Sequence, residues 1–129
     1  MFFIFMSSID HRYLVSDPIA FLPRLGELGF VLARSRYREL ERVPDVKGEH
    51  ELFRTELKLG AVAVVLEEYP FAHFLRIKGD KFSVGEISTK LGFSEKDAIS
   101  ETVEVLFALW RSERGLGESV NLRFDNYNL

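Results

Sequence analysis

The chain has 129 residues, a length typical of one domain, and its 47% hydrophobic and 29% charged residues are ordinary for a globular protein. It contains no cysteine, which excludes disulfides, thiolate metal sites and a cysteine nucleophile, and which fits a reducing cytoplasm. The net charge of −3 provides no overall attraction to nucleic acid or anionic lipid, so any such attraction must come from a local patch.

The first eight residues leave three interpretations open. The apolar run Met1–Met6 has no basic region and no small-residue cleavage site, so it does not match a secretory signal. Either Phe2–Phe5 form a short buried strand, or the segment is disordered, or the protein starts at Met6. No window reaches the roughly 20 apolar residues of a membrane span. We therefore expect one cytoplasmic domain over residues 1–129, with no membrane association.

The first predicted helix follows Asp17 and Pro18. Aspartate caps helices well, and proline suits the first helical position because its missing N–H leaves nothing unpaired there. Apolar residues further along give this helix one buried side, although Pro23 should kink it or move its start. Gly29 suits its C-terminal end.

Four segments with the pattern of strands follow, at residues 30–38, 51–59, 61–66 and 73–78. Short connections join most of them, including a turn at Gly60, and this favours antiparallel pairing. A fifth short strand is predicted at residues 120–124. It could pair within the chain or with a second copy, so both a monomer and a homodimer stay open.

A long helix is predicted from Ser94 to about Ser112, because Ser94 and Asp97 approximate a capping box and an apolar side follows at helical spacing. The order of elements is helix, four strands, helix and short strand. It predicts a two-layer α+β fold, in which a mostly antiparallel sheet of four to five strands carries its helices on one face.

Seven basic residues and one phenylalanine are predicted to share the other face of this sheet. Alternate side chains of a strand point to the same side, and the arginines between residues 34 and 38 alternate. This prediction assumes a regular register, because a shift by one residue moves a strand's side chains to the opposite face. The predicted set is Arg34, Arg36, Arg38, Arg54, Lys58, Phe74, Arg76 and Lys78.

The cationic face has a structural and a functional interpretation. It is either a solvated surface with cross-strand ion pairs to Glu56 and Glu67, or a docking site. The leading functional hypothesis is a small non-enzymatic binding protein, inhibitor-, immunity- or adaptor-like, that docks an acidic protein partner. The first alternative is nucleic-acid binding, since an aromatic side chain among arginines also suits stacking on unpaired bases.

Residues 84–110 resemble a helix-turn-helix DNA-binding segment, which offers the nucleic-acid alternative a second surface. Ser88 lies four positions before Gly92, and the predicted capped helix follows. Residues 94–129, however, carry four basic and seven acidic side chains, which does not suit contact with phosphates. A helical hairpin that serves packing is the simpler interpretation.

The second alternative is an enzyme whose site is not visible in the sequence. The histidines are His11, His50 and His73. Residues 50–54 begin like a zinc-protease motif but lack its second histidine, and His73 is in phase with apolar neighbours, as a core or edge residue would be. We therefore assign no catalytic residue, no metal ligand and no cofactor.

Overall fold

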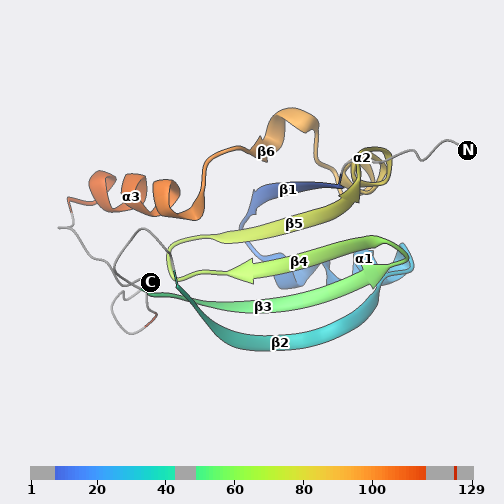
Figure 1. Ribbon diagram of the computed structural model, residues 1–129, viewed down its shortest axis with the longest axis horizontal. Coiled ribbons are helices and arrows are strands. Elements are labelled where there is room, and N and C mark those ends of the chain that lie inside the picture. Colours follow the sequence, from blue (N-terminus) through green and yellow to red (C-terminus); the bar gives the residue numbers. More distant parts are fainter. Residues whose placement is uncertain (1–7, 43–48, 116–123, 125–129) are drawn as a thin grey trace, which may run out of the picture.

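The computed structural model describes residues 8–42, 49–115 and 124 (Figure 1). The predictions for residues 1–7 and for the last strand, apart from Phe124, lie outside the described residues. The elements in chain order are β1 (Ser8–Val15), the 3-10 turn η1 (Pro18–Phe21), α1 (Leu22–Glu27), β2 (Val31–Arg42), β3 (Glu49–Leu59), β4 (Val62–Glu68), β5 (His73–Asp80), α2 (Lys81–Lys90), the 3-10 turn η2 (Glu95–Asp97), β6 (Ala98–Ile99) and α3 (Val103–Glu113).

The strands form one sheet in the order β2-β3-β4-β5-β1-β6, and every neighbouring pair is antiparallel. This confirms the predicted α+β fold, with six strands where four or five were expected. The four predicted segments became β2 to β5. The additions are β1, which pairs with β5 along its whole length, and the two-residue β6.

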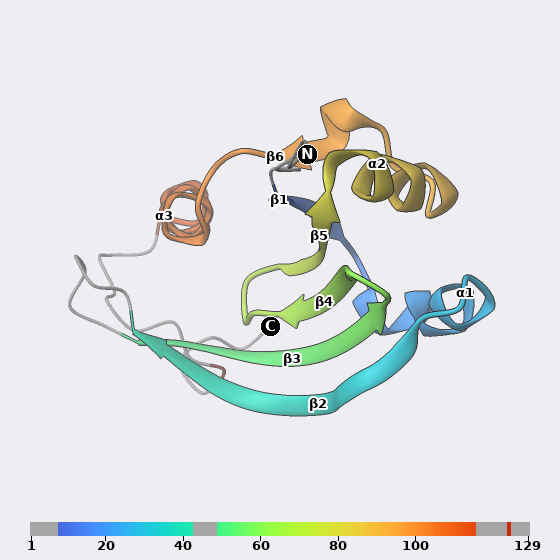
Figure 2. The same ribbon diagram turned by 45° about the vertical axis from the view of Figure 1, so that its right-hand side comes forward.

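The first helical segments and α2 cover one face of the sheet and enclose the main hydrophobic core (Figure 2). Gly29 ends this helical region with φ of 99°, a conformation that glycine adopts without strain. The strands contribute most of its buried side chains, and α1 and α2 contribute Leu25, Val84 and Ile87. The buried members of this core are Tyr13, Leu25, Phe30, Leu57, Val62, Val64, Leu66, Leu75, Ile77, Val84 and Ile87.

α3 packs on the opposite face of the sheet, at one end. Its Val103 and Phe107 pack with Leu52, Tyr69 and Phe74 in a second, smaller core. The prediction of helices on one face therefore describes α1 and α2 but not α3. The rest of that second face carries the polar and charged side chains.

The helix predicted from Ser94 does not form as a continuous helix. Ser94 and Asp97 do make the predicted capping box, but it caps only the single 3-10 turn η2. The next residues, Ala98 and Ile99, pair with β1 instead, and Thr102 then caps α3 by accepting a hydrogen bond from the Val105 N–H at 3.3 Å. Pairing with a distant strand has overridden a local helix signal, so residues 84–110 are not two helices joined by a tight turn.

We call the face opposite α1 and α2 the open face. Residues that lie opposite each other in an antiparallel pair share a face, so the strand registers define its members. These are Ser8, Asp10, Arg12, Leu14, Val31, Arg34, Tyr37, Glu39, Glu41, His50, Leu52, Arg54, Glu56, Lys58, Ala63, Val65, Glu67, Phe74, Arg76, Lys78 and Asp80.

Candidate functional site

The centre of the open face is organised around Glu67, a side chain with no exposed surface. Arginines from three strands contact its carboxylate: Nη2 of Arg12 at 3.3 Å, Nη2 of Arg54 at 3.2 Å and Nη1 of Arg76 at 3.1 Å. The register brings them together, because Arg54 lies directly opposite Glu67 while Arg12 and Arg76 face each other one row away. A buried carboxylate without such partners would be strongly destabilising.

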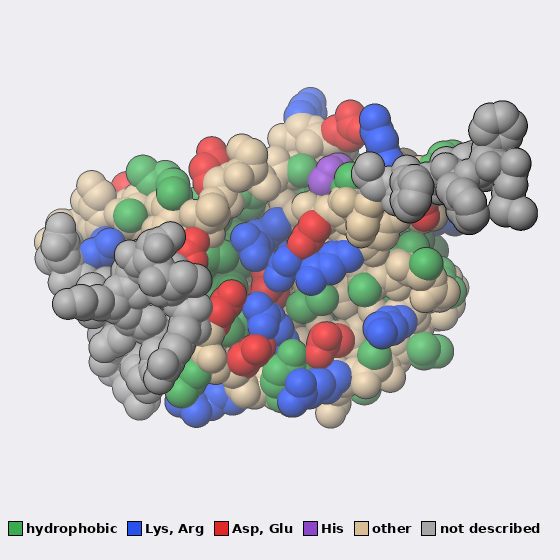
Figure 3. Space-filling view, viewed as in Figure 1, with side chains coloured by type: hydrophobic (Ala, Val, Ile, Leu, Met, Phe, Trp, Pro, Cys, Tyr) green, Lys and Arg blue, Asp and Glu red, His purple; other side chains and the backbone are tan. Residues whose placement is uncertain are grey.

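Carboxylates at the rim of this cluster bind the outer ends of two arginines. Asp10 pairs with Arg76, while Glu39 and Glu41 pair with Arg54. These carboxylate side chains are 37–42% exposed, against 16–17% for the two arginines that they contact. The network therefore turns carboxylates outward and keeps guanidinium groups inside. Figure 3 shows the result, acidic and basic side chains interleaved in the centre of the face rather than a uniform cationic patch.

The structure places six of the eight predicted side chains on the open face, and it moves two away. Arg36 and Arg38 lie on the opposite face. There Arg36 pairs with Glu68 at 2.8 Å and lies 3.8 Å from the centre of the Phe53 ring, and Arg38 pairs with Glu51. The prediction that all the arginines between residues 34 and 38 share a face is wrong.

Two irregularities in the pairing of β2 with β3 explain this division. The register shifts once between Leu32 and Arg34 and again between Arg34 and Tyr37. Each shift inserts one extra residue into β2, and an extra residue exchanges the faces of the side chains that follow. Arg34 and Tyr37 consequently share the open face, whereas Arg36 does not.

Phe74 is on the open face but cannot contact a partner there. Its side chain has no exposed surface, because α3 covers it and the guanidinium of Arg12 lies 5.4 Å from its ring centre. The aromatic residue that was predicted to support recognition is therefore part of the second core.

Three of the predicted cations form no ion pair with any residue in the described part of the chain: Arg34, Lys58 and Lys78. Arg34 lies over the Tyr37 ring, 3.5 Å from its centre. Lys58 and Lys78 both lie opposite Ala63, one on each side of β4, which puts their backbones about 10 Å apart. These residues occupy the end of the open face that is remote from α3.

The sequence interpretation missed one residue of the network, Arg12. It belongs to β1, whose apolar residues Ile9, Tyr13 and Val15 lie at even spacing and are a strand signal that could have revealed it. The sequence interpretation did name Glu67 as an ion-pair partner, but on a solvated face and not as the buried centre of the network. Its phase with Ala63 and Val65 could have placed it inside the sheet face.

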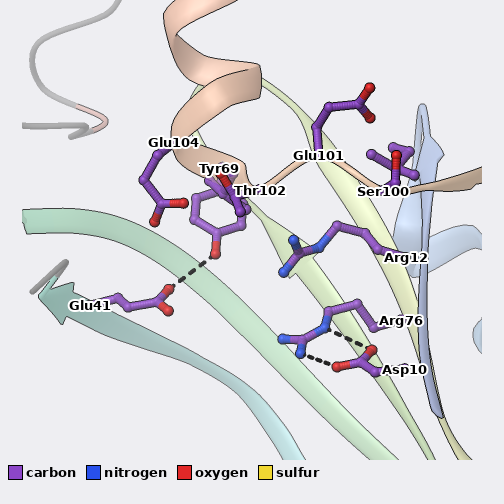
Figure 4. A pocket seen from close by; sticks show the side chains of 11 residues that line it. Asp10, Arg12, Glu41, Tyr69, Arg76, Ser100, Glu101, Thr102 and Glu104 are labelled. Atoms are coloured by element: carbon purple, nitrogen blue, oxygen red, sulfur yellow. Dashed lines mark hydrogen bonds and ion pairs between the residues drawn. The ribbon is translucent and has the colours of Figure 1, made fainter. Parts of the chain in front are cut away.

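A pocket of about 350 Å³ opens between the network and the start of α3 (Figure 4). Arg12, Arg76 and Asp10 line one side of it, and Ser100 to Glu104 line the other. Between them Tyr69 donates a hydrogen bond from its hydroxyl to Glu41 at 3.1 Å. Burial and the neighbouring carboxylates Glu67 and Glu41 raise the pKa of Tyr69, so this hydroxyl stays protonated.

His50 lies next to Glu104, one of the residues that line this pocket, and is only 5% exposed. Its Nδ1 is 4.0 Å from a carboxylate oxygen of Glu104, too far for a hydrogen bond, and it has no other hydrogen-bond partner among the described residues. Burial lowers the pKa of His50, while the nearby carboxylates of Glu104 and Glu41 oppose part of that effect. His50 is therefore neutral near pH 7.

Searches of protein-family models, of curated proteins and of solved structures find no match to this chain. In the part of the chain that the structure covers, no cluster of three or more His, Cys, Asp or Glu side chains is placed to bind a metal ion. No described helix is both long and apolar enough to cross a bilayer. The site is a mixed-charge face with a polar pocket at one end and, at the other, cations that form no ion pair with the described residues.

Proposed function

We propose that the chain is a small non-enzymatic binding protein that docks an acidic protein surface on the open face. The observation that carries the proposal is a set of cations that have no ion-pair partner among the described residues and lie at the end of the face that α3 does not reach: Arg34, Lys58 and Lys78. Between the lysines lies Ala63, whose small side chain leaves room for a partner's carboxylates to approach both ammonium groups.

The arginine network supports this role by making the face rigid. Each of Arg12, Arg54 and Arg76 is fixed by at least one carboxylate, so the sheet face loses little side-chain freedom on binding. Because carboxylates within the face already balance their charge, these arginines fix the shape of the face more than they attract a partner. The attraction of an acidic partner comes from Arg34, Lys58 and Lys78, which would speed association and select for an acidic surface.

Nucleic-acid binding by the same face is the alternative that the charge balance favours less. A phosphate backbone needs a continuous row of free cations, and the central arginines are already engaged by Glu67 and the rim carboxylates. The helix-turn-helix alternative needs a recognition helix directly after Gly92, where η2 and β6 lie instead.

One observation favours an enzyme. His50 lies 4.0 Å from the carboxylate of Glu104, and Glu104 lines a pocket. A general base, however, must reach the proton that it removes. The imidazole of His50 is 95% covered, and the side chains lining the pocket do not include it. The binding function is therefore the better supported of the two.

A capture experiment with matched charge reversals tests the proposal. The tagged chain is exposed to lysate of its source cell in three forms: wild type, Lys58→Glu/Lys78→Glu, and Lys81→Glu/Lys96→Glu. The third carries the same charge change on α2 and η2, where both lysines are exposed. We expect wild type and the third form to retain the same acidic protein after nuclease treatment, and the first double variant to lose it by at least tenfold. Circular dichroism checks that all three forms are folded.

Two results would contradict the proposal. One is a captured protein that binds the Lys58→Glu/Lys78→Glu variant as well as wild type. The other is capture that nuclease abolishes and that weakens linearly in log affinity against log salt, which indicates nucleic acid. Loss of that nucleic acid from the Lys81→Glu/Lys96→Glu variant would then point to the segment 84–110.

Reversing the charges of Arg36 and Arg54 is not a clean test, because the two residues lie on different faces and Arg54 contacts the buried Glu67.

A further inference from the structure

A groove of about 1100 Å³ lies between β1 and α2, on the face of the sheet opposite the open face. Ile9, His11 and Tyr13 of β1 form one wall, and α2 with the residues that follow it forms the other. The lining is mostly apolar, and Phe82 at the rim is 76% exposed. An exposed apolar surface of this kind typically marks a site that another chain covers.

The polar side chains on the floor of this groove already have partners. Tyr13 donates a hydrogen bond from its hydroxyl to Ser88 at 2.9 Å, and the ring of Phe93 stacks on Tyr13 at 4.3 Å. On the α2 wall, a Cβ added to Gly85 would meet nothing within 4 Å, so this residue leaves open space. The groove therefore suits an apolar occupant.

β1 borders the groove with a backbone edge that the other described strands leave free. On one side, β5 pairs with β1 from Ser8 to Val15. On the other side, β6 pairs only with Arg12 and Tyr13. The edge from Ser8 to His11 therefore has no strand partner among the described residues. A free edge beside a groove for side chains is the arrangement by which proteins bind an extended segment as an added strand.

An apolar segment of this chain directly precedes that edge. Residues 1–6 are Met-Phe-Phe-Ile-Phe-Met, and phenylalanine and isoleucine favour strands. To reach the edge of its own β1, the segment would have to reverse at Met6 and Ser7, whereas two-residue hairpin turns favour glycine and asparagine. The segment of a second copy reaches the same edge without a turn, as a straight continuation of β1. A second copy is therefore the better source.

Two-fold symmetry decides which side chains of the segment face the groove. In a symmetric antiparallel pair, one residue lies opposite its own copy, and residues equally far before and after it face each other. With Ser7 at the axis, Phe5 lies opposite Ile9 of the partner subunit, and Phe3 lies opposite His11 of the partner subunit. Opposite residues share a face, so both phenylalanines lie over the partner's groove.

We propose that two copies of this chain associate through β1. Residues 3–7 of each copy add a strand to the free edge of the other, and Phe3 and Phe5 cover its groove. The inference goes beyond the docking function, because the groove and the open face lie on opposite sides of the sheet. A two-fold axis perpendicular to the sheet keeps both open faces on one side of the dimer, where each stays accessible.

Sedimentation velocity of the full chain and of three variants tests the proposal. The full chain should form a dimer whose fraction rises with concentration. Deleting residues 1–5 removes no residue of the described fold and should leave a monomer. Phe3→Ala/Phe5→Ala should weaken the dimer about tenfold or more, whereas Phe2→Ala/Ile4→Ala, which changes side chains directed away from the groove, should weaken it less. Circular dichroism checks that every variant is folded.

The absence of cysteine allows a separate test of the register. Ser7→Cys should form a disulfide-linked dimer on mild oxidation, because the two copies of residue 7 lie opposite each other with Cα atoms about 5 Å apart. Ser8→Cys is the matched control. Its two copies are about 8 Å apart in the same register, which is too far for a disulfide.

A monomer at every concentration tested would overturn the proposal, and so would a dimer that persists without residues 1–5. A larger effect of Phe2→Ala/Ile4→Ala would overturn it as well, because a hairpin within one chain turns Phe2 and Ile4 toward the groove. Equal cross-linking of Ser7→Cys and Ser8→Cys would overturn the register. These experiments need no acidic partner, so their outcome does not depend on the capture experiment.

Discussion

Replacing Glu67 by glutamine tests the charged network most directly. The change keeps the shape of the side chain and removes the charge that Arg12, Arg54 and Arg76 contact at 3.1–3.3 Å. Removing one partner of a buried ion pair typically costs about 3–5 kcal/mol, because the remaining charges stay desolvated. The arginine side chains retain 16–19% exposure and the rim carboxylates still pair with two of them, so we expect the lower end, about 3 kcal/mol.

Urea unfolding followed by circular dichroism measures this change. With a slope of about 2 kcal/mol/M, a loss of about 3 kcal/mol moves the midpoint down by about 1.5 M. Glu68→Gln is the matched control, since it is the neighbouring residue on the opposite face and pairs with an arginine that is 50% exposed. That pair should contribute less than about 1 kcal/mol. Equal midpoints for the two variants would refute the view that Glu67 organises the face.

Two further predictions concern α3 and its contact with the sheet. The pKa of His50 is lowered in the folded protein from its ordinary value of 6.5, so the unfolded chain binds its proton first as the pH falls. The free energy of unfolding should therefore drop between pH 7 and 5 in wild type and drop less in His50→Gln, and urea midpoints with the same slope in both would contradict this. Thr102→Ala removes the hydroxyl that accepts from the Val105 N–H, which should cost about 1 kcal/mol in urea unfolding. Ser94→Ala, which affects only the 3-10 turn η2, should cost less, and the reverse order would show that α3 is not held by its cap.

Alternation along the sequence was sufficient to predict the strands β3 and β5 and the side chains that they place on one face, while a continuous apolar run predicted β4. Arg54, Lys58, Arg76 and Lys78 lie there because their strands keep a regular register. The same rule fails on β2, where the arginines alternate from residue 34 to residue 38 and no glycine or proline between residues 31 and 38 indicates an irregularity. Whether a strand bulges depends on its partner, and a single sequence does not contain that information.

The network itself depends on contacts between residues far apart in the chain. Arg12 and Glu67 are separated by 55 positions, and no local pattern connects them. The helix predicted from Ser94 also shows that a local sequence pattern does not determine long-range pairing. Its capping box formed as expected, but pairing of Ala98 and Ile99 with β1 decided what followed. Sequence patterns predicted the strands β2 to β5, while β1, β6 and the charge balance of the site depend on tertiary pairing.

The irregular register of β2 also affects how copies of this protein meet one another. β2 is an outer strand among the described strands and is 12 residues long, so the backbone groups on its outer side could accept a further strand from another molecule. The two shifts distribute its charges to both sides, with Arg34 and Glu39 on one and Arg36 and Arg38 on the other. A strand added here would have to cover charged side chains on both of its faces. The feature that divides the arginines therefore also protects the longest exposed edge of the sheet from aggregation.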